Sequence, residues 1–392
     1  MRHIRLMAGA GGLIAAATVA ATAAGAGAAA APKVKVAATG LNSPKHLLYT
    51  PKGILVAESG VGGKKGGSTC VPGPVTGGQG TTTYCEGRTA AIALITPTAT
   101  KVVDGKLPSV VEEDSGEAAG PAAVALTSTG HRAVLYQDTL VTKTGGTAVT
   151  GPGKSAFGTL QLGSGLTVNL ARYGAQHPQN PATFGGTPGE TTYDSDPYSV
   201  TSYRGGYAAT DAAGNSLLSV SSKGKIRLLA RFPTVPETAP AGVFGPTAVT
   251  INAQAVPTSV AVGPDGALYV GLLRGVPSAP GTAYIYRVVP GHAPAIWAKG
   301  LTAVTAIAFD ARGRLLATEL STGGLLAAGT APGALVRISA DGKKVSTLPV
   351  SGLSEPTGVA VAPDGTVYVS NRGTSPGSAS KPGEVLKITG LK

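Results

Sequence analysis

The chain has 392 residues, only 13% of them are charged, and its formal net charge is +12. Typical globular domains carry about a quarter charged residues, and here Gly, Ala, Ser and Thr fill that share, which suits a sheet protein with many turns. The basic residues are scattered, with no run longer than Lys64-Lys65 or Lys343-Lys344 and no basic stripe interleaved with aromatic residues. The composition therefore argues against a nucleic-acid partner.

The first 30 residues have the organisation of a secretory signal peptide. A short basic start with Arg2 and Arg5 precedes an apolar, Ala-rich run, which closes with Ala28-Ala29-Ala30. Such a segment is removed on export. The alternative is a transmembrane anchor, which the weak hydrophobicity of Ala and Gly and the absence of a basic flank disfavour. We expect a secreted, monomeric protein without a membrane anchor, with one domain over residues 31–392.

A hairpin pattern follows a first alternating run, residues 33–38, and occurs six times. Each copy begins with proline, or with Val304 in the fifth, and has glycine nine residues later. The copies begin at residues 44, 121, 197, 257, 304 and 356. Proline fixes φ where the chain enters a strand, and glycine supplies the positive φ that a tight hairpin turn needs. Strand-turn-strand repeats with a period of roughly 40 to 50 residues are typical of a propeller or a solenoid.

Alternating runs after each hairpin predict two further strands in every repeat. These cover residues 89–96 and 100–103, 157–162 and 166–171, 216–220 and 225–230, 283–288 and 295–298, and 333–338 and 343–348. The sixth copy has only one more strand, residues 384–389, so we expect residues 33–38 to supply its fourth. The predicted fold is all-β: a six-bladed β-propeller with four-stranded blades, the last closed by the N-terminal strand. No sustained helical periodicity is present after residue 30.

Extra chain length is concentrated in four connections, residues 59–88, 139–156, 172–196 and 232–256. All of them lie between strands two and three or between blades, so they leave a propeller on one face, here named the long-loop face. Connections this long are uncommon unless they bind a partner or are disordered. We expect a small-molecule, glycan or protein ligand on this face. Tolerated insertion of Gly-, Pro- and Thr-rich sequence is the alternative.

Both cysteines, Cys70 and Cys85, lie in the first long connection. An even count in an exported chain predicts a disulfide. A metal site would need His or further Cys at short spacing, and the connection has neither.

Polar residues stand where five of the second strands are predicted to end: Glu58, Asp138, Asp211, Glu319 and Asn371. In the fourth blade Leu272 holds this place, and His46 begins the first inner strand on the same face. The five residues and His46 form a candidate axial binding site. Among them Glu58, Asp211 and Asn371 are candidate ligands for Ca²⁺ or another divalent cation, because Ca²⁺ takes oxygen ligands. The alternative is that these groups accept hydrogen bonds from loop N–H groups.

Two segments resemble the ScyD/ScyE family of exported proteins. The first is Asp194-Ser195-Asp196-Pro197-Tyr198-Ser199-Val200 with residues 211–220 after it, and the second covers residues 256–272 with Tyr284-Ile285-Tyr286-Arg287-Val288. The resemblance implies a six-bladed propeller of the NHL and TolB type and no defined activity. Ser199 stands where glycine is usual in the family, and Leu272 where an acidic residue often occurs, which weakens any family site in blades three and four.

The sequence contains no nucleophile–base–acid motif, phosphate loop or zinc motif, so we predict no catalytic residue. Two function classes stay open. The first is a non-catalytic exported binding or scaffold module that uses the long-loop face. The second is a metal-dependent hydrolase resembling the gluconolactonase-like propellers, with a cation held at the axis. Carboxyl oxygens that converge on the axis would favour the hydrolase, and side chains turned into loops would favour the module.

Overall fold

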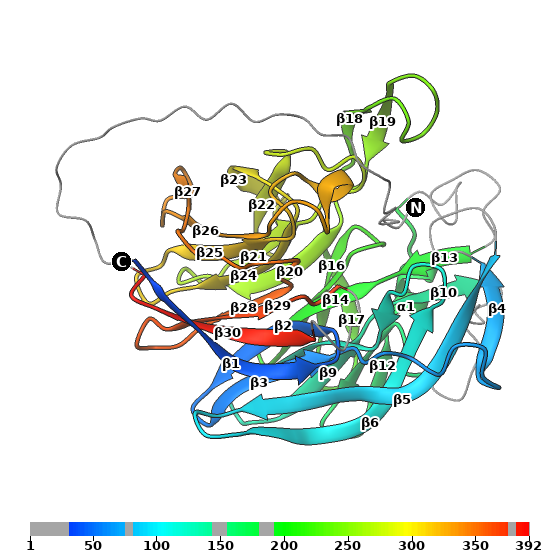
Figure 1. Ribbon diagram of the computed structural model, residues 1–392, viewed down its shortest axis with the longest axis horizontal. Coiled ribbons are helices and arrows are strands. Elements are labelled where there is room, and N and C mark those ends of the chain that lie inside the picture. The colour runs from blue at the N-terminus through cyan, green and yellow to red at the C-terminus, as the bar shows by residue number, and fades with distance from the viewer. Residues whose placement is uncertain (1–30, 75–80, 143–154, 180–191, 375–381, 392) are drawn as a thin grey trace.

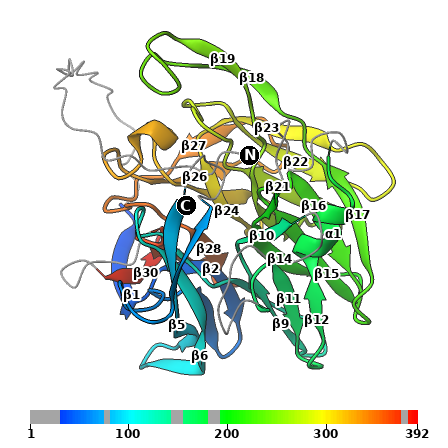
Figure 2. The ribbon, with the colours of Figure 1, turned by 90° about the vertical axis from the view of Figure 1, so that its right-hand side faces the viewer.

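The computed structural model describes residues 31–74, 81–142, 155–179, 192–374 and 382–391. Six antiparallel sheets of at least four strands form the blades of a propeller (Figures 1 and 2). This confirms the predicted six-bladed, all-β fold. The predicted signal peptide, residues 1–30, lies outside the described residues.

Blades one to three contain most of the added chain length. Their strands are β2 (Pro44–Thr50), β3 (Gly53–Glu58), β5 (Thr81–Ile95) and β6 (Thr100–Glu112); β8 (Pro121–Leu126), β9 (Arg132–Tyr136), β11 (Thr159–Leu162) and β12 (Thr167–Asn169); and β14 (Pro197–Tyr203), β15 (Gly206–Asp211), β16 (Ser216–Val220) and β17 (Ile226–Arg231). Two short strands extend the sheet of blade one, β4 (Cys70–Pro74) beside β5 and β7 (Ala118–Ala119) beside β6.

Blades four to six follow the predicted plan more closely. Their strands are β20 (Pro257–Val262), β21 (Leu268–Leu272), β22 (Ala283–Val288) and β23 (Ala295–Leu301); β24 (Val304–Phe309), β25 (Leu315–Glu319), β26 (Ala334–Ile338) and β27 (Val345–Thr347); and β28 (Gly358–Val361), β29 (Val367–Asn371), β30 (Gly383–Thr389) and β1 (Lys33–Leu41). A one-turn 3-10 helix, η1 (Leu325–Ala327), lies between β25 and β26.

The N-terminal strand closes the last blade, as predicted. β1 pairs antiparallel with β30 from Lys33 opposite Thr389 to Leu41 opposite Gly383, with two bulges. Without β1, the outer edge of β30 would be unpaired, and free sheet edges are templates for aggregation.

The repeat glycine has positive φ in five of the six hairpins. Blade three differs, because Arg204 and Gly205 take positive φ there and Gly206 already begins β15. Two consecutive left-handed residues are the conformation of a type I′ turn, whose twist matches that of the flanking strands.

The hydrophobic core lies between neighbouring blades rather than along the axis. Six clusters of buried residues occupy the six interfaces between blades, including the interface between blade six and blade one. In that interface Leu41 of β1 and Val385 of β30 pack with Val56 of β3. The closing strand therefore contributes to the core as well as to the sheet.

The long connections have secondary structure of their own, which the sequence did not indicate. β10 (Thr139–Thr142) pairs with β13 (Thr192–Ser195), and β18 (Val235–Ala239) pairs with β19 (Val249–Ala253). β4, β10, β13 and the β18–β19 hairpin lie toward one side in Figure 1, and Figure 2 looks onto that side.

The predicted fourth strand of blade two, residues 166–171, is wrong at its end. The strand stops at Asn169, whose side chain accepts a hydrogen bond from the backbone N–H of Arg172 at 2.6 Å and so caps α1 (Leu170–Gln176). A helix of seven residues is too short to give a periodic sequence pattern.

Within the described residues, no helix combines the length and apolar character needed to cross a membrane.

Candidate functional site

A series of threonine hydroxyls joins the inner strands of neighbouring blades. Thr258 donates to the backbone oxygen of Val304 at 2.6 Å, Thr305 to Pro356 at 2.7 Å and Thr357 to Pro44 at 2.6 Å. Each threonine is the second residue of its repeat, and each acceptor is the first residue of the next. These buried bonds connect blades four, five, six and one in turn, and we name them the threonine series.

The threonine series stops in blades one to three, where the same repeat position holds Lys45, Ala122 and Tyr198. Lys45 is only 1% exposed, and its Nζ lies 5.9 Å from the centre of the Tyr198 ring. His46 meets the same ring edge-on, with 5.4 Å between ring centres. Because Lys45 and His46 belong to blade one and Tyr198 to blade three, their side chains meet across the ring. We name Lys45, His46 and Tyr198 the axial cluster.

The imidazole of His46 is held neutral. Burial, together with the charge of Lys45, lowers the pKa of His46 to about 4. Backbone oxygens of Ala122 and Thr258 face the ring, but both ring nitrogens are buried and make no hydrogen bond of good geometry with any described residue. A buried polar atom without a partner is costly in a folded protein, so a bound water or ligand group at His46 would stabilise it.

Four carboxylates act electrostatically on the buried ammonium of Lys45: Glu117, Asp138, Asp196 and Glu355. Burial lowers the pKa of Lys45, and these four negative charges act in the opposite direction. Unlike Lys45, the four acidic residues are half-buried or exposed, and they come from four different connections. We name them the acidic rim. Burial, together with the charges of Asp196 and Glu117, raises the pKa of the Tyr198 phenol, which therefore stays protonated.

Most of the strand-end residues predicted as an axial ring are bonded to loop backbone. The backbone N–H groups that they accept belong to Asn42 for Glu58 (2.8 Å), Asp196 and Gly214 for Asp211 (2.9 Å each), Thr302 for Glu319 (2.7 Å), and Ser354 for Asn371 (2.8 Å). All four side chains are buried. They fix the loops that enter or leave each blade, which is the structural role considered above as the alternative.

Burial is the largest influence on the ionisation of these strand-end carboxyl groups. It raises the pKa of Glu58 and Asp211, and it raises that of Glu319 to about 7, while the donated N–H groups act in the opposite direction. A pKa near 7 means that Glu319 exchanges its proton close to neutral pH.

Asp138 occupies a different position from the other predicted ring residues. The strand partner of Pro121 is Tyr136, so β9 ends two residues before Asp138, which has a φ of 56°. Asp138 belongs to the acidic rim, and His46 belongs to the axial cluster. These two predicted site residues share an interaction with the charge of Lys45. The strand-end residues instead accept hydrogen bonds in separate loops.

The residues proposed as calcium ligands do not fit a shared ion as they are placed. Glu58, Asp211 and Asn371 belong to three different blades, and each already accepts a backbone N–H. Among the described residues, the only group of three or more His, Cys, Asp or Glu side chains whose ligand atoms lie within 4.8 Å of one another is Cys70, Cys85 and Glu113. Calcium binding by the strand-end residues stays a prediction.

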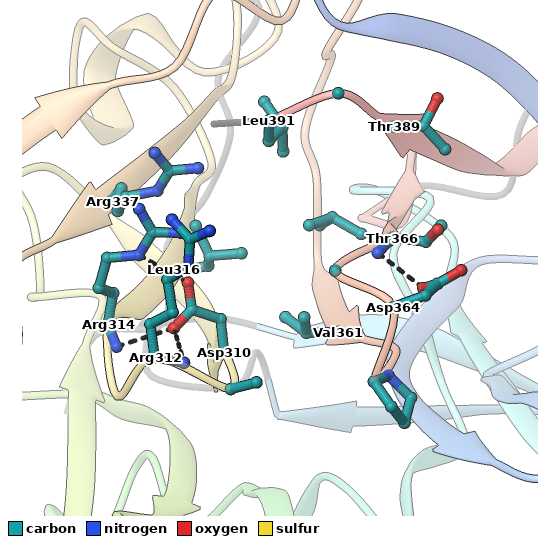
Figure 3. Close-up of a pocket in the computed structure, with 15 residues that line it drawn as sticks. Asp310, Arg312, Arg314, Leu316, Arg337, Val361, Asp364, Thr366, Thr389 and Leu391 are labelled. Carbon is teal, nitrogen blue, oxygen red and sulfur yellow. Dashed lines mark hydrogen bonds and ion pairs between the residues drawn. The ribbon is translucent and has the colours of Figure 1, made fainter.

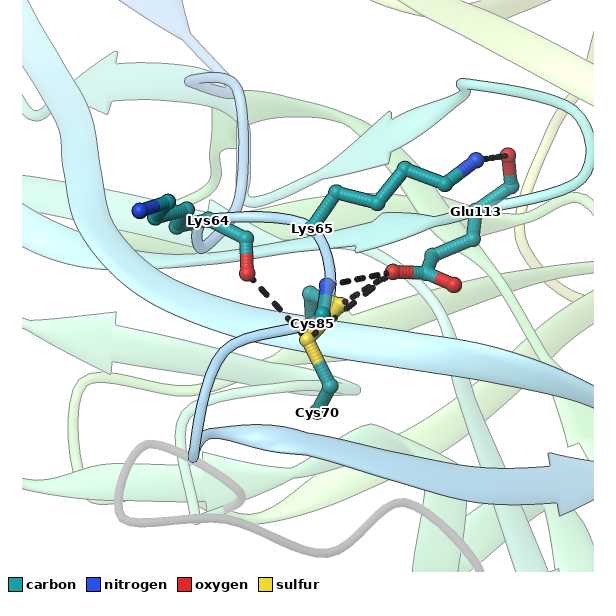
Figure 4. The surroundings of a disulfide bond; sticks show 6 residues. Lys64, Lys65, Cys70, Cys85 and Glu113 are labelled. Carbon is teal, nitrogen blue, oxygen red and sulfur yellow. Dashed lines mark hydrogen bonds between the residues drawn. A yellow bond between two sulfur atoms is a disulfide. The ribbon is translucent and has the colours of Figure 1, made fainter.

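The Cys70–Cys85 disulfide is present, as predicted, and joins β4 to β5 (Figure 4). Glu113 lies beside it, with Oε1 at 3.1 Å from Cys85 Sγ and 3.0 Å from the backbone nitrogen of Gly66. Metal ions bind thiolate sulfur, and these two sulfurs are joined to each other. In the disulfide form this cluster therefore fixes the connection and offers no thiolate to a metal.

The sequence reasoning missed Tyr198, Glu117, Asp196 and Glu355 as site residues. A signal for the axial cluster was present in the repeat itself, since the second repeat position reads Lys, Ala, Tyr, Thr, Thr, Thr along the chain. Two of the three blades that depart from threonine, blades one and three, supply the side chains of the axial cluster. No comparable signal marks the acidic rim, because its residues lie in connections that do not repeat.

Scans for family models and for curated proteins found no match to this sequence. Among solved structures, the chain is similar to a streptogramin B lyase (12% identity, 91% of this chain and 97% of that chain, TM-score 0.47) and to virginiamycin B lyase from Staphylococcus aureus (13%, 91% and 99%, TM-score 0.44). It is also similar to the PQQ-bound aldose sugar dehydrogenase from Streptomyces coelicolor (13%, 92% and 99%, TM-score 0.44). The matched proteins include six-bladed propellers. At these identities the similarity carries no information about activity.

Proposed function

We propose that this protein is an exported, monomeric binding module that holds its ligand at the axial end of the long-loop face. The observation that carries the proposal is the burial of Lys45 together with the four charges of the acidic rim that act on its ammonium group. Burying a charge is unfavourable unless it is paired, and ionisable groups whose pKa is perturbed in this way gather at functional sites. The resemblance to the ScyD/ScyE family, which assigns no chemistry, is part of the proposal.

The chemistry of the rim indicates the kind of ligand. Its four carboxylates outnumber the single ammonium of Lys45, and His46 is neutral, so the charged groups at this end are mostly acceptors of hydrogen bonds. A ligand that presents hydroxyl or ammonium groups would donate to them. We therefore propose a small molecule, glycan or peptide rich in such donors.

The same geometry favours a binding module over a metal-dependent hydrolase. The hydrolase would need side-chain oxygens of Glu58, Asp211 and Asn371 to converge on one cation. Instead these oxygens accept hydrogen bonds from loop backbone in separate blades. The described residues present no alternative set of carboxylates grouped closely enough to replace them.

Binding can be tested with probes that carry the proposed groups. We would titrate the mature protein with spermidine and with a panel of defined neutral oligosaccharides by isothermal calorimetry. The double variant Glu117→Gln/Asp138→Asn should weaken saturable binding at least tenfold, which corresponds to about 1.4 kcal/mol. The control is Asp104→Asn/Asp341→Asn, which makes the same change in net charge away from the axis. Absence of saturable binding to every probe, or unchanged binding by the rim variant, would refute the proposal.

The calcium prediction needs a separate measurement. Melting temperatures of the wild type and of Glu58→Gln/Asp211→Asn would be compared with and without millimolar Ca²⁺. A cation held by these residues stabilises the folded wild type by mass action, and the variant should lose that gain. If Ca²⁺ leaves the wild type unchanged and the variant melts identically, the strand-end residues hold no calcium.

A further inference from the structure

A cavity of about 370 Å³ lies between blades five and six, among the first hairpin turns of the two repeats (Figure 3). These turns are at the ends of the inner strands opposite to the long-loop face. Arg312, Arg314 and Arg337 of blade five lie on one wall, and residues of the β28–β29 turn and the end of β30 form the other. The cavity is thus separate from the axial cluster and its rim.

The third strand of each of the last three blades carries a basic residue at the same register. Arg287 pairs with Tyr269 in blade four, Arg337 with Leu316 in blade five, and Lys387 with Tyr368 in blade six. Each of these cations lies on the strand next to the first hairpin of its blade. The charge of the residue in the hairpin turn therefore determines whether the cation has an attractive or a repulsive neighbour.

In blades four and six the hairpin turn supplies a carboxylate. The turn residue Asp265 forms an ion pair with Arg287 at 2.7 Å, and Asp364 is attracted by Lys387. At the corresponding turn position, one residue before the repeat glycine, blade five carries Arg312. The charge of the turn is therefore reversed in this one blade of the three.

The remaining acidic residue of the blade-five turn is engaged by its own neighbours. Asp310 accepts a hydrogen bond from Nε of Arg314 at 2.7 Å and from the backbone nitrogens of Arg312 and Arg314 at 2.9 Å. Although partial burial acts in the opposite direction, these bonds lower the pKa of Asp310. Burial and the charge of Arg314 lower the pKa of Arg337, with a smaller contribution from Arg312, while the charge of Asp310 acts in the opposite direction. Three guanidinium groups are thus crowded around one bonded carboxylate.

The rest of the cavity is partly apolar. Leu316, Val361 and Leu391 contribute carbon surface to its lining. A volume of about 370 Å³ is within the range of small-molecule sites and is larger than an inorganic anion requires. Guanidinium groups bind carboxylate, sulfate and phosphate groups through paired hydrogen bonds.

We propose that this cavity is a second binding site, which takes a small organic anion. The guanidinium groups of Arg312 and Arg337 hold its phosphate, sulfate or carboxylate group, and its carbon portion lies against Leu316, Val361 and Leu391. The site is independent of the proposed function, because it lies at the other end of the blades and shares no residue with the rim.

The probe for this site is phenyl phosphate, with inorganic phosphate for comparison, both titrated at constant ionic strength. The wild type should bind phenyl phosphate saturably and several times more tightly than inorganic phosphate. Arg312→Asp, which restores the turn charge of blades four and six, and Arg337→Gln should each weaken phenyl phosphate binding at least tenfold. The control, Arg287→Gln, changes the matching residue of blade four and should leave the affinity unchanged.

Three results would overturn the proposal. The first is no saturable binding of phenyl phosphate to the wild type. The second is wild-type affinity in both Arg312→Asp and Arg337→Gln, with their melting temperatures showing that they are folded. The third is equal affinity for phenyl phosphate and inorganic phosphate, which would mean that the apolar residues of the cavity contribute nothing to binding. None of these results bears on binding at the acidic rim, so the two sites can fail separately.

Discussion

The two halves of the propeller use the same repeat for different purposes. In blades four to six the second repeat position is always threonine, and its hydroxyl joins one blade to the next. In blades one to three that position holds Lys45, Ala122 and Tyr198, and the connections are long enough to form strands and a helix of their own. The second half therefore holds the ring together, whereas the first half places charged and aromatic groups at the axis.

This difference indicates where sites arise in a repeat protein. A repeat position that holds the same residue in several blades forms the contacts between blades. Where a blade has a different residue at that position, its side chain is available for another role. Lys45 and Tyr198 are such departures at the axis, and Arg312 is one in a hairpin turn. Both proposed sites lie where one blade differs chemically from its neighbours.

The largest effect is expected from removing the strand that joins the halves. Deleting residues 33–38 should lower the free energy of unfolding by about 4 kcal/mol or more, because a ladder with β30 is lost and its hydrogen bonds contribute roughly 1 kcal/mol each. Urea denaturation measures the loss, and size-exclusion chromatography should show association through the exposed edge of β30. A deleted protein that stays monomeric with wild-type stability would show that the ring does not need this strand.

Removing the disulfide should have the next largest effect, confined to the first half. Cys70→Ser/Cys85→Ser opens a link across 15 residues, and loop-closure entropy for that length sets a limit of about 3 kcal/mol. Hydrogen exchange should increase around β4 and the adjoining part of β5 while blades four to six keep their protection. Uniformly faster exchange in all six blades would mean that the halves are not independent in this respect.

Glu319 provides a pH-dependent test within the second half. Its folded pKa of about 7 is raised above the ordinary value of 4.5, so its contribution to stability is fully present below pH 4.5 and is lost as the pH rises through 7. Glu319→Gln keeps an acceptor for the Thr302 N–H without the charge. The variant should be more stable than the wild type by about 3 kcal/mol at pH 8 and nearly equal at pH 4.5.

The measurement for Glu319→Gln is urea denaturation at the two pH values. Asp341→Asn serves as the control, because Asp341 is an exposed turn residue whose pKa is lowered by its hydrogen bonds with Ser339 and Lys343. It should show no gain at pH 8. A stability difference for Glu319→Gln that does not change with pH would contradict the raised pKa.

The smallest effect is expected from breaking one link of the threonine series. Thr357→Val removes the hydroxyl that bonds the Pro44 carbonyl and leaves that buried oxygen with one partner fewer, which should cost about 1 kcal/mol. Thr258→Val, the matched change between blades four and five, should cost a similar amount. Chemical denaturation of both variants tests this, and no loss in either would mean that the threonine series does not stabilise the second half.

Sequence patterns were sufficient for the parts of the structure that repeat. Strand alternation predicted β16 and β22 at their observed ends, and the short sixth copy predicted the closing strand. These features depend on local chain geometry, which the order of residues expresses directly.

The candidate site depends on contacts across the ring, which local patterns do not express. Lys45 and Tyr198 meet although 152 residues, including all of blade two, lie between them in sequence. The residues of the acidic rim come from connections without a common motif. Asp138 was grouped with the strand ends because the end of β9 was placed two residues too far along the chain. Where burial and long-range contact set the role of a residue, as for His46, the three-dimensional arrangement is required.

The contacts that seal the ring also set the order in which the molecule can assemble. Thr357 reaches the carbonyl of Pro44 across 313 residues, and Ser370 reaches that of Lys45 across 325. Contacts between such distant residues form late and slowly, because a long loop must close before they can stabilise anything. The contact from Ser370 fixes the backbone of Lys45 only when blade six meets blade one. We therefore expect no axial cluster in a chain whose ring is not yet closed. Only a propeller with a closed ring would then bind a ligand at the rim. A partly folded chain would not compete with it for the ligand.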